Sequence, residues 1–173
     1  NGTTLLEYAV SSLCLPHVSE VIVVLGHQSA QLQIPDSDPR VRYVVNERYE
    51  IGRSESIKCG LKHIDQLSEN ILLIGVDQPR TPEIISRIID VHLRKGSLIT
   101  SPRFEGKGGH PLMFSRTLKE QLATINEDTQ GMREIFRLYR EKVTNIELQE
   151  PMVCLDINTP EQYRRAKQMY SDR

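Results

Sequence analysis

Two aspartates stand out because each lies between an apolar run and the start of a predicted helix. Asp77 follows the run 71–76, and Asp156 lies near the end of the run 152–157. Both precede a Thr-Pro-Glu sequence by three or four residues, and this sequence is typical of a helix start because Thr caps well and Pro is favoured at the first helical position. Two carboxylates at neighbouring strand ends could hold a divalent cation, and Mg²⁺ prefers a few carboxylates with its other positions left to water and phosphates.

Such a cation would stabilise the negative charge that develops during phosphoryl transfer. A simpler interpretation remains open, in which each aspartate only interacts favourably with the positive end of the helix that follows it.

A second candidate site is the predicted helix start at Gly52, Ser54 and Ser56. Free backbone amides at a helix start can bind a phosphate or the polar edge of a base. Serine is also a common helix cap without any ligand. Asn46, at the end of a predicted strand, could donate a hydrogen bond to a base carbonyl or simply hold a loop in place.

The glycine-rich segment 104–111 is a third candidate, predicted to be a loop. Its glycines allow the backbone to approach a ligand closely. Lys107 adds a positive charge, and His110 could form a hydrogen bond or transfer a proton. The alternative is a surface loop in which His110 packs against Pro111.

The pattern of apolar residues predicts the elements that must position these side chains. The run 71–76 is apolar at every position, which is expected of a strand covered on both faces. Asp77 would therefore lie at the carboxyl end of a central strand, where open α/β sheets bind their ligands. Strands alternating with helices predict a mostly parallel, doubly covered sheet. The predicted strands are 21–25, 41–45, 71–76, 98–101, 111–114, 144–148 and 152–157.

Composition narrows the class of protein. With 173 residues, the chain is most simply one domain, residues 1–173. A net charge of −1 argues against a general nucleic-acid binder. No apolar run reaches the length of a membrane span. Three widely spaced cysteines indicate buried thiols in a reducing compartment, so we expect a cytoplasmic protein.

Taken together, these motifs resemble the MobA-like nucleotidyltransferases, in particular the molybdenum cofactor cytidylyltransferase branch. Each motif is short, but their joint order and spacing along nearly the whole chain are fairly specific. The matching segments are Gly2–Glu7, Val21–His27, Val45–Asn46, Gly52–Ser56, Lys58–Leu61, Asp77–Pro79, Gly109–Pro111, Gln130–Arg133 and Leu155–Glu161.

The resemblance implies a Rossmann-like, three-layer α/β fold of the GT-A type and the transfer of a nucleoside monophosphate from an NTP to a phosphate-bearing acceptor. It implies that Asp77 and Asp156 are the catalytic aspartates and the ligands of Mg²⁺. The nucleotide pocket would contain Asn46, Gly52, Ser54, Ser56 and Gly75. The acceptor would meet Gly109, His110, Pro111 and Arg133.

One feature of the family is missing from these 173 residues. Members of the family begin with a strand and a glycine-rich loop that cradles the triphosphate, and this chain begins where that loop should end. We therefore expect a domain truncated at its N-terminus, whose sheet lacks the usual first strand and exposes an edge.

The leading hypothesis is the transfer of CMP from CTP to the phosphate of molybdopterin. The alternatives are the use of GTP or another acceptor, and a domain that binds nucleotides without turnover.

Overall fold

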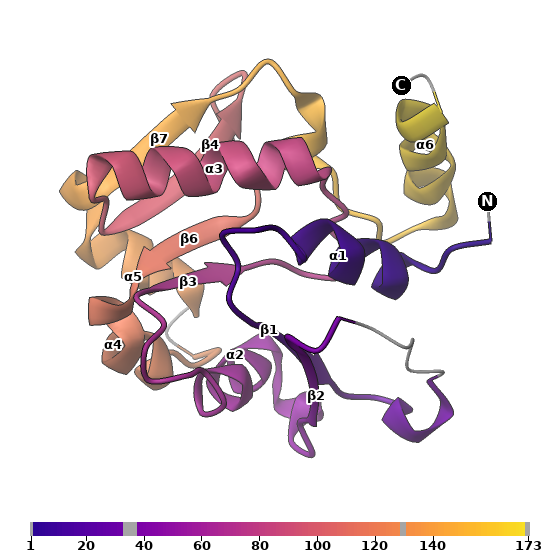
Figure 1. The fold of residues 1–173 in the computed structure, drawn as a ribbon, viewed down its shortest axis with the longest axis horizontal. Helices are drawn as coiled ribbons and strands as arrows, with labels where there is room; N and C mark the ends of the chain where they lie inside the picture. Colours follow the sequence, from indigo (N-terminus) through magenta and orange to yellow (C-terminus); the bar gives the residue numbers. More distant parts are fainter. Residues whose placement is uncertain (1, 33–37, 129–130, 172–173) are drawn as a thin grey trace.

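Two separate β-sheets form the centre of the fold (Figure 1). The structure is a computed structural model and describes residues 2–32, 38–128 and 131–171. Its strands are β1 (Val21–Leu25), β2 (Val41–Val45), β3 (Asn70–Leu73), β4 (Ile99–Phe104), β5 (Lys107–Gly108), β6 (Leu112–Ser115) and β7 (Val143–Glu147). Its α-helices are α1 (Leu5–Leu13), α2 (Arg53–Leu61), α3 (Pro82–Lys95), α4 (Lys119–Thr124), α5 (Met132–Leu138) and α6 (Pro160–Ser171).

The helix starts are formed as the sequence predicts. The Thr81 hydroxyl accepts a hydrogen bond from the backbone amide of Ile84, and Pro82 is the first residue of α3. The Thr159 hydroxyl accepts from the amide of Gln162 at the start of α6, at 3.2 Å. Both side chains satisfy amides that have no partner within the helix, which fixes where each helix begins.

The prediction of a mostly parallel sheet is wrong. The larger sheet has the order β3-β6-β4-β5, and all three of these pairings are antiparallel; β7 adds to β4 in parallel. The predicted loop 104–111 explains the difference, because β4 continues to Phe104 and returns through the short strand β5. Connections this short cannot hold a crossover helix, so β5 and β6 each run antiparallel to β4.

The predicted strand 152–157 is also absent. Residues Pro151–Cys154 form a 3₁₀ helix, and an extended segment without strand pairing follows it. The carbonyl of Val153 accepts a hydrogen bond from the amide of His110 at 2.8 Å. The start of the apolar run, Met152 and Val153, is buried in the core beside α3 and not as part of a strand.

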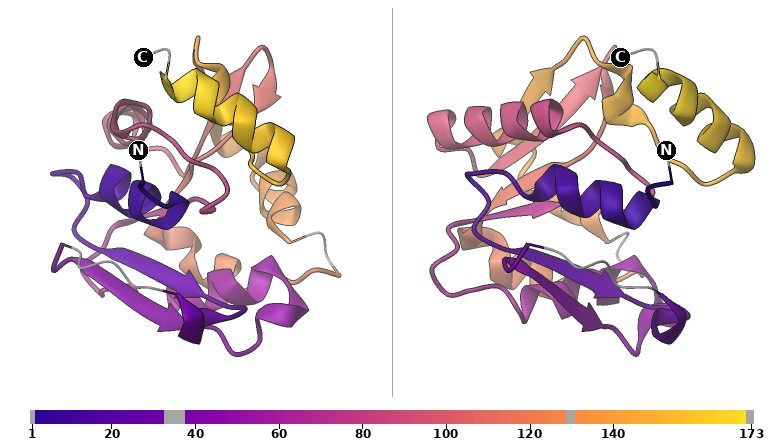
Figure 2. Two further views of the ribbon diagram at one scale, coloured as in Figure 1. Left: turned by 90° about the vertical axis from the view of Figure 1, so that its right-hand side faces the viewer. Right: turned by 45° about the vertical axis from the view of Figure 1, so that its right-hand side comes forward.

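Helices cover both faces of the larger sheet, which gives three layers (Figures 1 and 2). On one face, α3 buries a row of isoleucines against Met113 and Leu148. Side chains of α1 and α6 pack at the border of this core; it contains Ile84, Ile85, Ile88, Ile89, Met113, Leu148, Met152 and Val153. On the other face, α2, α4 and α5 enclose a second core made of Leu61, Ile71, Ile99, Leu112, Phe114, Leu118, Leu122, Ile125 and Ile135.

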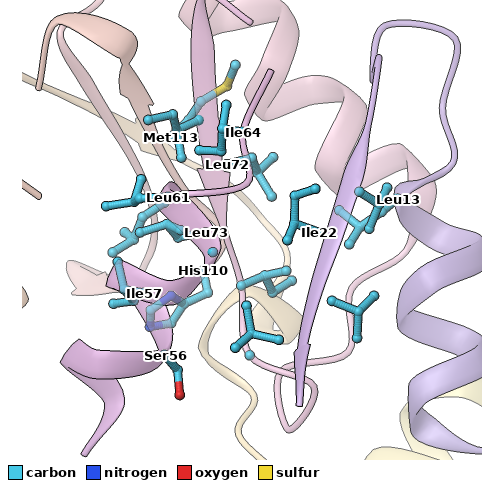
Figure 3. A pocket seen from close by; sticks show the side chains of 18 of the residues that line it. Leu13, Ile22, Ser56, Ile57, Leu61, Ile64, Leu72, Leu73, His110 and Met113 are labelled. Atoms are coloured by element: carbon cyan, nitrogen blue, oxygen red, sulfur yellow. The ribbon is translucent and has the colours of Figure 1, made fainter. Parts of the chain in front are cut away.

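The smaller sheet contains only β1 and β2, paired in parallel. β1 and β3 face each other without pairing, and a cavity of about 1290 Å³ lies between them (Figure 3). Among the residues that the structure describes, β1 and β2 therefore form a sheet of their own, separate from the sheet that contains β3. None of the helices in these ranges is long and apolar enough to cross a membrane.

Candidate active site

Asp77 lies in a tight turn four residues beyond the end of β3. The predicted strand 71–76 is shorter than expected, because β3 ends at Leu73, and it is an edge strand of the larger sheet and not a central one. The amide of Gly75 donates to Oε1 of Gln78 at 2.9 Å, and the amide of Gln78 donates to the carbonyl of Gly75 at 3.0 Å. A side chain at position 75 would overlap Oδ1 of Asp77. Gly75 therefore leaves the space that the Asp77 carboxylate occupies.

A backbone hydrogen bond holds Asp156 beside Asp77. The amide of Ile157 donates to the carbonyl of Asp77 at 2.7 Å, so the two aspartates lie on neighbouring segments. Oδ1 of Asp156 is buried and has no hydrogen-bond partner. Since a buried carboxylate oxygen normally has a partner, this atom is free to bind a ligand or a cation.

Arg80 connects the three segments around the aspartates. Its side chain is only 1% exposed, and the guanidinium donates four hydrogen bonds. Nε donates to the carbonyl of His110 at 2.9 Å, and the terminal nitrogens donate to the carbonyls of Pro79, Leu155 and Val153, each at 2.8 Å. One side chain thus joins the Asp77 turn, the His110 loop and the segment that carries Asp156.

The charge of Arg80 is balanced without a direct ion pair. Burial lowers the pKa of Arg80 to about 10, and the negative charges of Asp156 and Asp77 oppose this shift. The guanidinium therefore stays protonated at neutral pH and adds positive potential beside the two carboxylates.

The imidazole of His110 lines the cavity (Figure 3). Burial lowers its pKa to about 4, and the positive charges of Arg53 and Arg80 contribute to the shift, against the opposing effect of Asp156 and Asp77. The ring is therefore neutral at pH 7. Its Nδ1 is buried and has no hydrogen-bond partner, so it can form a hydrogen bond to a ligand.

The two residues that flank His110 determine the backbone conformation of this loop. A side chain at Gly109 would overlap the carbonyl of Val153, so glycine is needed for the close approach of the two backbones. The bond between His110 and Pro111 is cis. Gly109 and Pro111 are buried and do not line the cavity.

The predicted ligand site at the start of α2 is occupied by Glu127. Oε1 of this residue accepts from the amide of Ser54 at 2.8 Å, and hydrogen bonds from Ser54 lower the pKa of the carboxyl group. At Gly52, with a φ of +137°, an added Cβ would lie 2.7 Å from Cγ of Glu127. This helix start is therefore capped from within the protein.

Asn46 also has internal partners. Its Nδ2 donates to the hydroxyl of Ser56 at 3.1 Å, and its Oδ1 accepts from the amide of Arg48 at 3.0 Å. In this arrangement Asn46 joins the end of β2 to α2, which is the loop-holding role that the sequence left open.

The cavity brings together predicted residues from all three groups. Asp77, Gly75, Ser54, Ser56, His110 and Arg133 line it. Asn46, Gly52 and Asp156 do not. Gln130, part of the motif that includes Arg133, lies outside the described residues.

The sequence analysis missed three charged residues. Arg53 and Glu127 line the cavity, and Arg80 supports the loops around it. Arginine and glutamate in sequence usually indicate a solvated surface. The burial of Arg80 could have been predicted from its position between the end of a strand and a helix cap, where little side-chain surface can reach water.

The donor set fits Mg²⁺. Two carboxylates lie on adjacent segments, and one oxygen is buried without a partner. Within residues 2–32, 38–128 and 131–171, no group of three or more His, Cys, Asp or Glu side chains could hold a metal. Hard oxygen ligands from one or two carboxylates, completed by water and phosphates, are the usual Mg²⁺ environment.

A layered α/β fold with polar groups at the strand ends beside a large cavity defines a protein that binds ligands at that edge. The family is shown by comparison: residues 1–144 match the MobA-like NTP transferase domain. The chain belongs to this family of nucleotidyltransferases.

Individual relatives are distant. The chain is 24% identical over 170 residues to the molybdenum cofactor cytidylyltransferase of Escherichia coli K12, covering 98% of this chain and 84% of that protein. It is 23% identical over 121 residues to the bifunctional protein GlmU of Trichlorobacter lovleyi, covering 69% of this chain and 26% of that protein.

Solved structures confirm the α/β nucleotidyltransferase fold. Rv0371c from Mycobacterium tuberculosis H37Rv superposes with a TM-score of 0.81 at 26% identity, covering 96% of this chain and 84% of that one. A second structure of Rv0371c, a complex with manganese, gives a TM-score of 0.76 at 27% identity, with coverages of 95% and 87%.

Proposed function

We propose that this protein transfers CMP from CTP to the terminal phosphate of molybdopterin and releases pyrophosphate, with Mg²⁺ at Asp77 and Asp156. The observation that carries the proposal is the backbone hydrogen bond that joins the segments of Asp77 and Asp156, with Asp77 lining the cavity, in a member of the MobA-like family. The choice of CTP and molybdopterin is supported by the E. coli relative alone.

The reaction requires no protein nucleophile. A phosphate oxygen of the acceptor attacks the α-phosphorus of CTP, a new P–O bond forms, and the bond to the β-phosphate breaks so that pyrophosphate leaves. Bound Mg²⁺ supplies charge neutralisation on the α-phosphate and the leaving group. Positioning and electrostatics account for most of the catalysis in such reactions.

The remaining residues of the cavity bind and orient the substrates. His110 is neutral and offers its unpartnered Nδ1 to a phosphate or an acceptor group. Arg53 and Arg133 add positive charge along the same cavity. We assign Ser54, Ser56 and Gly75 to the nucleotide side and Arg133 to the acceptor side. Asn46, Gly52, Gly109 and Pro111 act through the loops they hold in place.

Calorimetric titration of CTP, GTP and ATP into the protein tests the proposal, first with Mg²⁺ and then with EDTA. Asp77→Ala is titrated in parallel, and Asp90→Ala, an exposed aspartate on α3, is the matched control. The expected result is Mg²⁺-dependent preference for CTP that Asp77→Ala loses and Asp90→Ala keeps.

Preference for GTP would instead favour guanylyl transfer within the same family. Nucleotide binding that is unchanged by EDTA and by Asp77→Ala would contradict the metal site.

A further inference from the structure

Glu127 places a carboxylate on the wall of the cavity beside the start of α2. Its Oε1 accepts from the amide of Ser54 at 2.8 Å, and Glu127, Arg53 and Ser54 all line the cavity. The hydrogen bonds from Ser54 hold the pKa of this carboxyl group below its ordinary value. At neutral pH the group is therefore ionised, so it accepts hydrogen bonds and cannot donate them.

Two glycines make this position of the carboxylate possible. At Gly52, whose φ is +137°, an added Cβ would lie 2.7 Å from Oε1 of Glu127. At Gly131, whose φ is +54°, an added Cβ would lie 3.3 Å from the hydroxyl oxygen of Ser54. The amide of Gly131 also donates to the carbonyl of Asn126 at 2.8 Å, which ties the residue before Glu127 to the start of α5. The backbone on both sides of the contact therefore brings this carboxylate to α2.

The wall around this carboxylate also has an apolar surface. Ile57 of α2 and Met132 and Phe136 of α5 line the cavity, and all three pack against the core on this side of the sheet. Pockets for small molecules combine such apolar surface with a few polar groups that fix the orientation of the ligand. A nucleobase matches this wall, because its two faces are apolar and its edge carries hydrogen-bonding groups.

A phosphate group does not match the same wall. The Ser54 amide, a donor that an anion would need, already donates to Glu127, and the negative charge of Glu127 repels a second anion. The phosphates of a nucleotide belong instead near Asp77, where a carboxylate is offered to Mg²⁺. Burial lowers the pKa of His110, and the charges of Arg53 and Asp77 also act on it, so this ring lies within reach of both parts of the cavity.

We propose that Glu127 selects nucleotides by the amino group of their base, with its carboxylate accepting a hydrogen bond from the exocyclic amino group of cytosine and disfavouring uracil. Uracil has a carbonyl oxygen at the position of that amino group, and a carbonyl cannot donate to a carboxylate. Glutamate and aspartate are suited to the amino group of cytosine for this reason. The selection then has an attractive part and a repulsive part.

The inference rests on the proposed nucleotidyl transfer and adds the residue that discriminates between bases. It does not require that the nucleotide be CTP. Guanine also has an exocyclic amino group, which hypoxanthine lacks. In an enzyme that transfers GMP, the same carboxylate would favour GTP over ITP.

Calorimetric titration in the presence of Mg²⁺ compares the Kd of CTP with that of UTP in the unaltered protein and in Glu127→Gln. Glutamine has the same shape, and its side-chain oxygen can still accept from the Ser54 amide, while its amide nitrogen can donate to the uracil carbonyl. We expect the unaltered protein to bind CTP about fivefold or more tightly than UTP, at the lower end for a side-chain contact to a base because Glu127 is exposed.

Glu127→Gln should reduce this ratio to less than about twofold, because the amide serves both bases. Glu120→Gln is the matched control: it removes the same charge from an exposed position on α4 that does not line the cavity, so it should keep the ratio. Circular dichroism of both variants checks that the fold is kept.

Equal Kd values for CTP and UTP in the unaltered protein, or a ratio that Glu127→Gln leaves unchanged, would overturn the role of Glu127 and leave the proposed transfer intact. If the protein binds GTP and neither pyrimidine nucleotide, the same two criteria apply to GTP and ITP. Binding of none of the four nucleotides would contradict the proposed function and this inference together.

Discussion

Replacing Arg80 by methionine removes the four donors that hold the loops of the candidate site together. A buried carbonyl without a partner costs about 1–3 kcal/mol. The carbonyl of Val153 keeps the amide of His110 as a donor, so the other three carbonyls set an upper bound, which water entry and the removal of a buried charge will reduce. We expect Arg80→Met to lower the free energy of unfolding by about 3 kcal/mol, the lower end of the cost of three unpartnered carbonyls.

Urea denaturation followed by circular dichroism measures the effect. Arg87→Met is the matched control, because Arg87 is exposed on α3. The free energy of unfolding of this variant should stay within about 0.5 kcal/mol of that of the unaltered protein. The free energy of unfolding of Arg80→Lys should lie between those of Arg80→Met and Arg87→Met, since an ammonium group lacks the planar, forked donors with which a guanidinium reaches four carbonyls. A loss below about 1 kcal/mol in Arg80→Met would refute the view that this side chain holds the three segments together.

Three further predictions concern single side chains. His110 binds a proton more readily in the unfolded state, so its contribution to stability is complete above about pH 6.5 and is lost as the pH falls toward its folded-state pKa of about 4. Urea titrations should therefore show that, when the pH is lowered from 7 to 5, the free energy of unfolding falls by about 2 kcal/mol less in His110→Gln than in the unaltered protein. Equal decreases in the two proteins would contradict the lowered pKa. Gly75→Ala should weaken Mn²⁺ binding about tenfold or more in calorimetry by displacing Asp77, whereas Gly108→Ala, with open space around the added methyl group, should not. Glu127→Ala should lower the free energy of unfolding by about 1 kcal/mol in urea through loss of the α2 cap, and an unchanged midpoint would contradict that role.

Helix starts were predictable because their signals are local. A threonine cap and a following proline act within one turn of the chain, and at Thr81 both appear in the structure as the sequence indicates. The position of Asp77 beyond a strand was predictable for the same reason, although β3 ends at Leu73 and lies at the edge of its sheet. Such features depend on neighbours in sequence, so no knowledge of the rest of the fold is needed.

Sheet pairing was less predictable because it depends on partners far away in sequence. Residues 152–157 have the apolar character of a strand, yet Val153 bonds to the His110 loop and to Arg80 instead. Apolar character predicts burial, and burial alone does not distinguish a strand from a segment that packs into the core outside the sheet.

In the predicted nucleotide pocket, too, the feature set by neighbouring residues was predictable and the contact with a residue distant in sequence was not. Serine and glycine at 52–56 do form a helix start, as predicted, but Glu127 reaches it from more than seventy residues away. Because a carboxylate already accepts from the Ser54 amide, an anionic ligand can bind there only by displacing Glu127. A neutral base edge could instead bind alongside the carboxylate. The negative charge of Glu127 therefore favours assigning this helix start to the base and not to the phosphates.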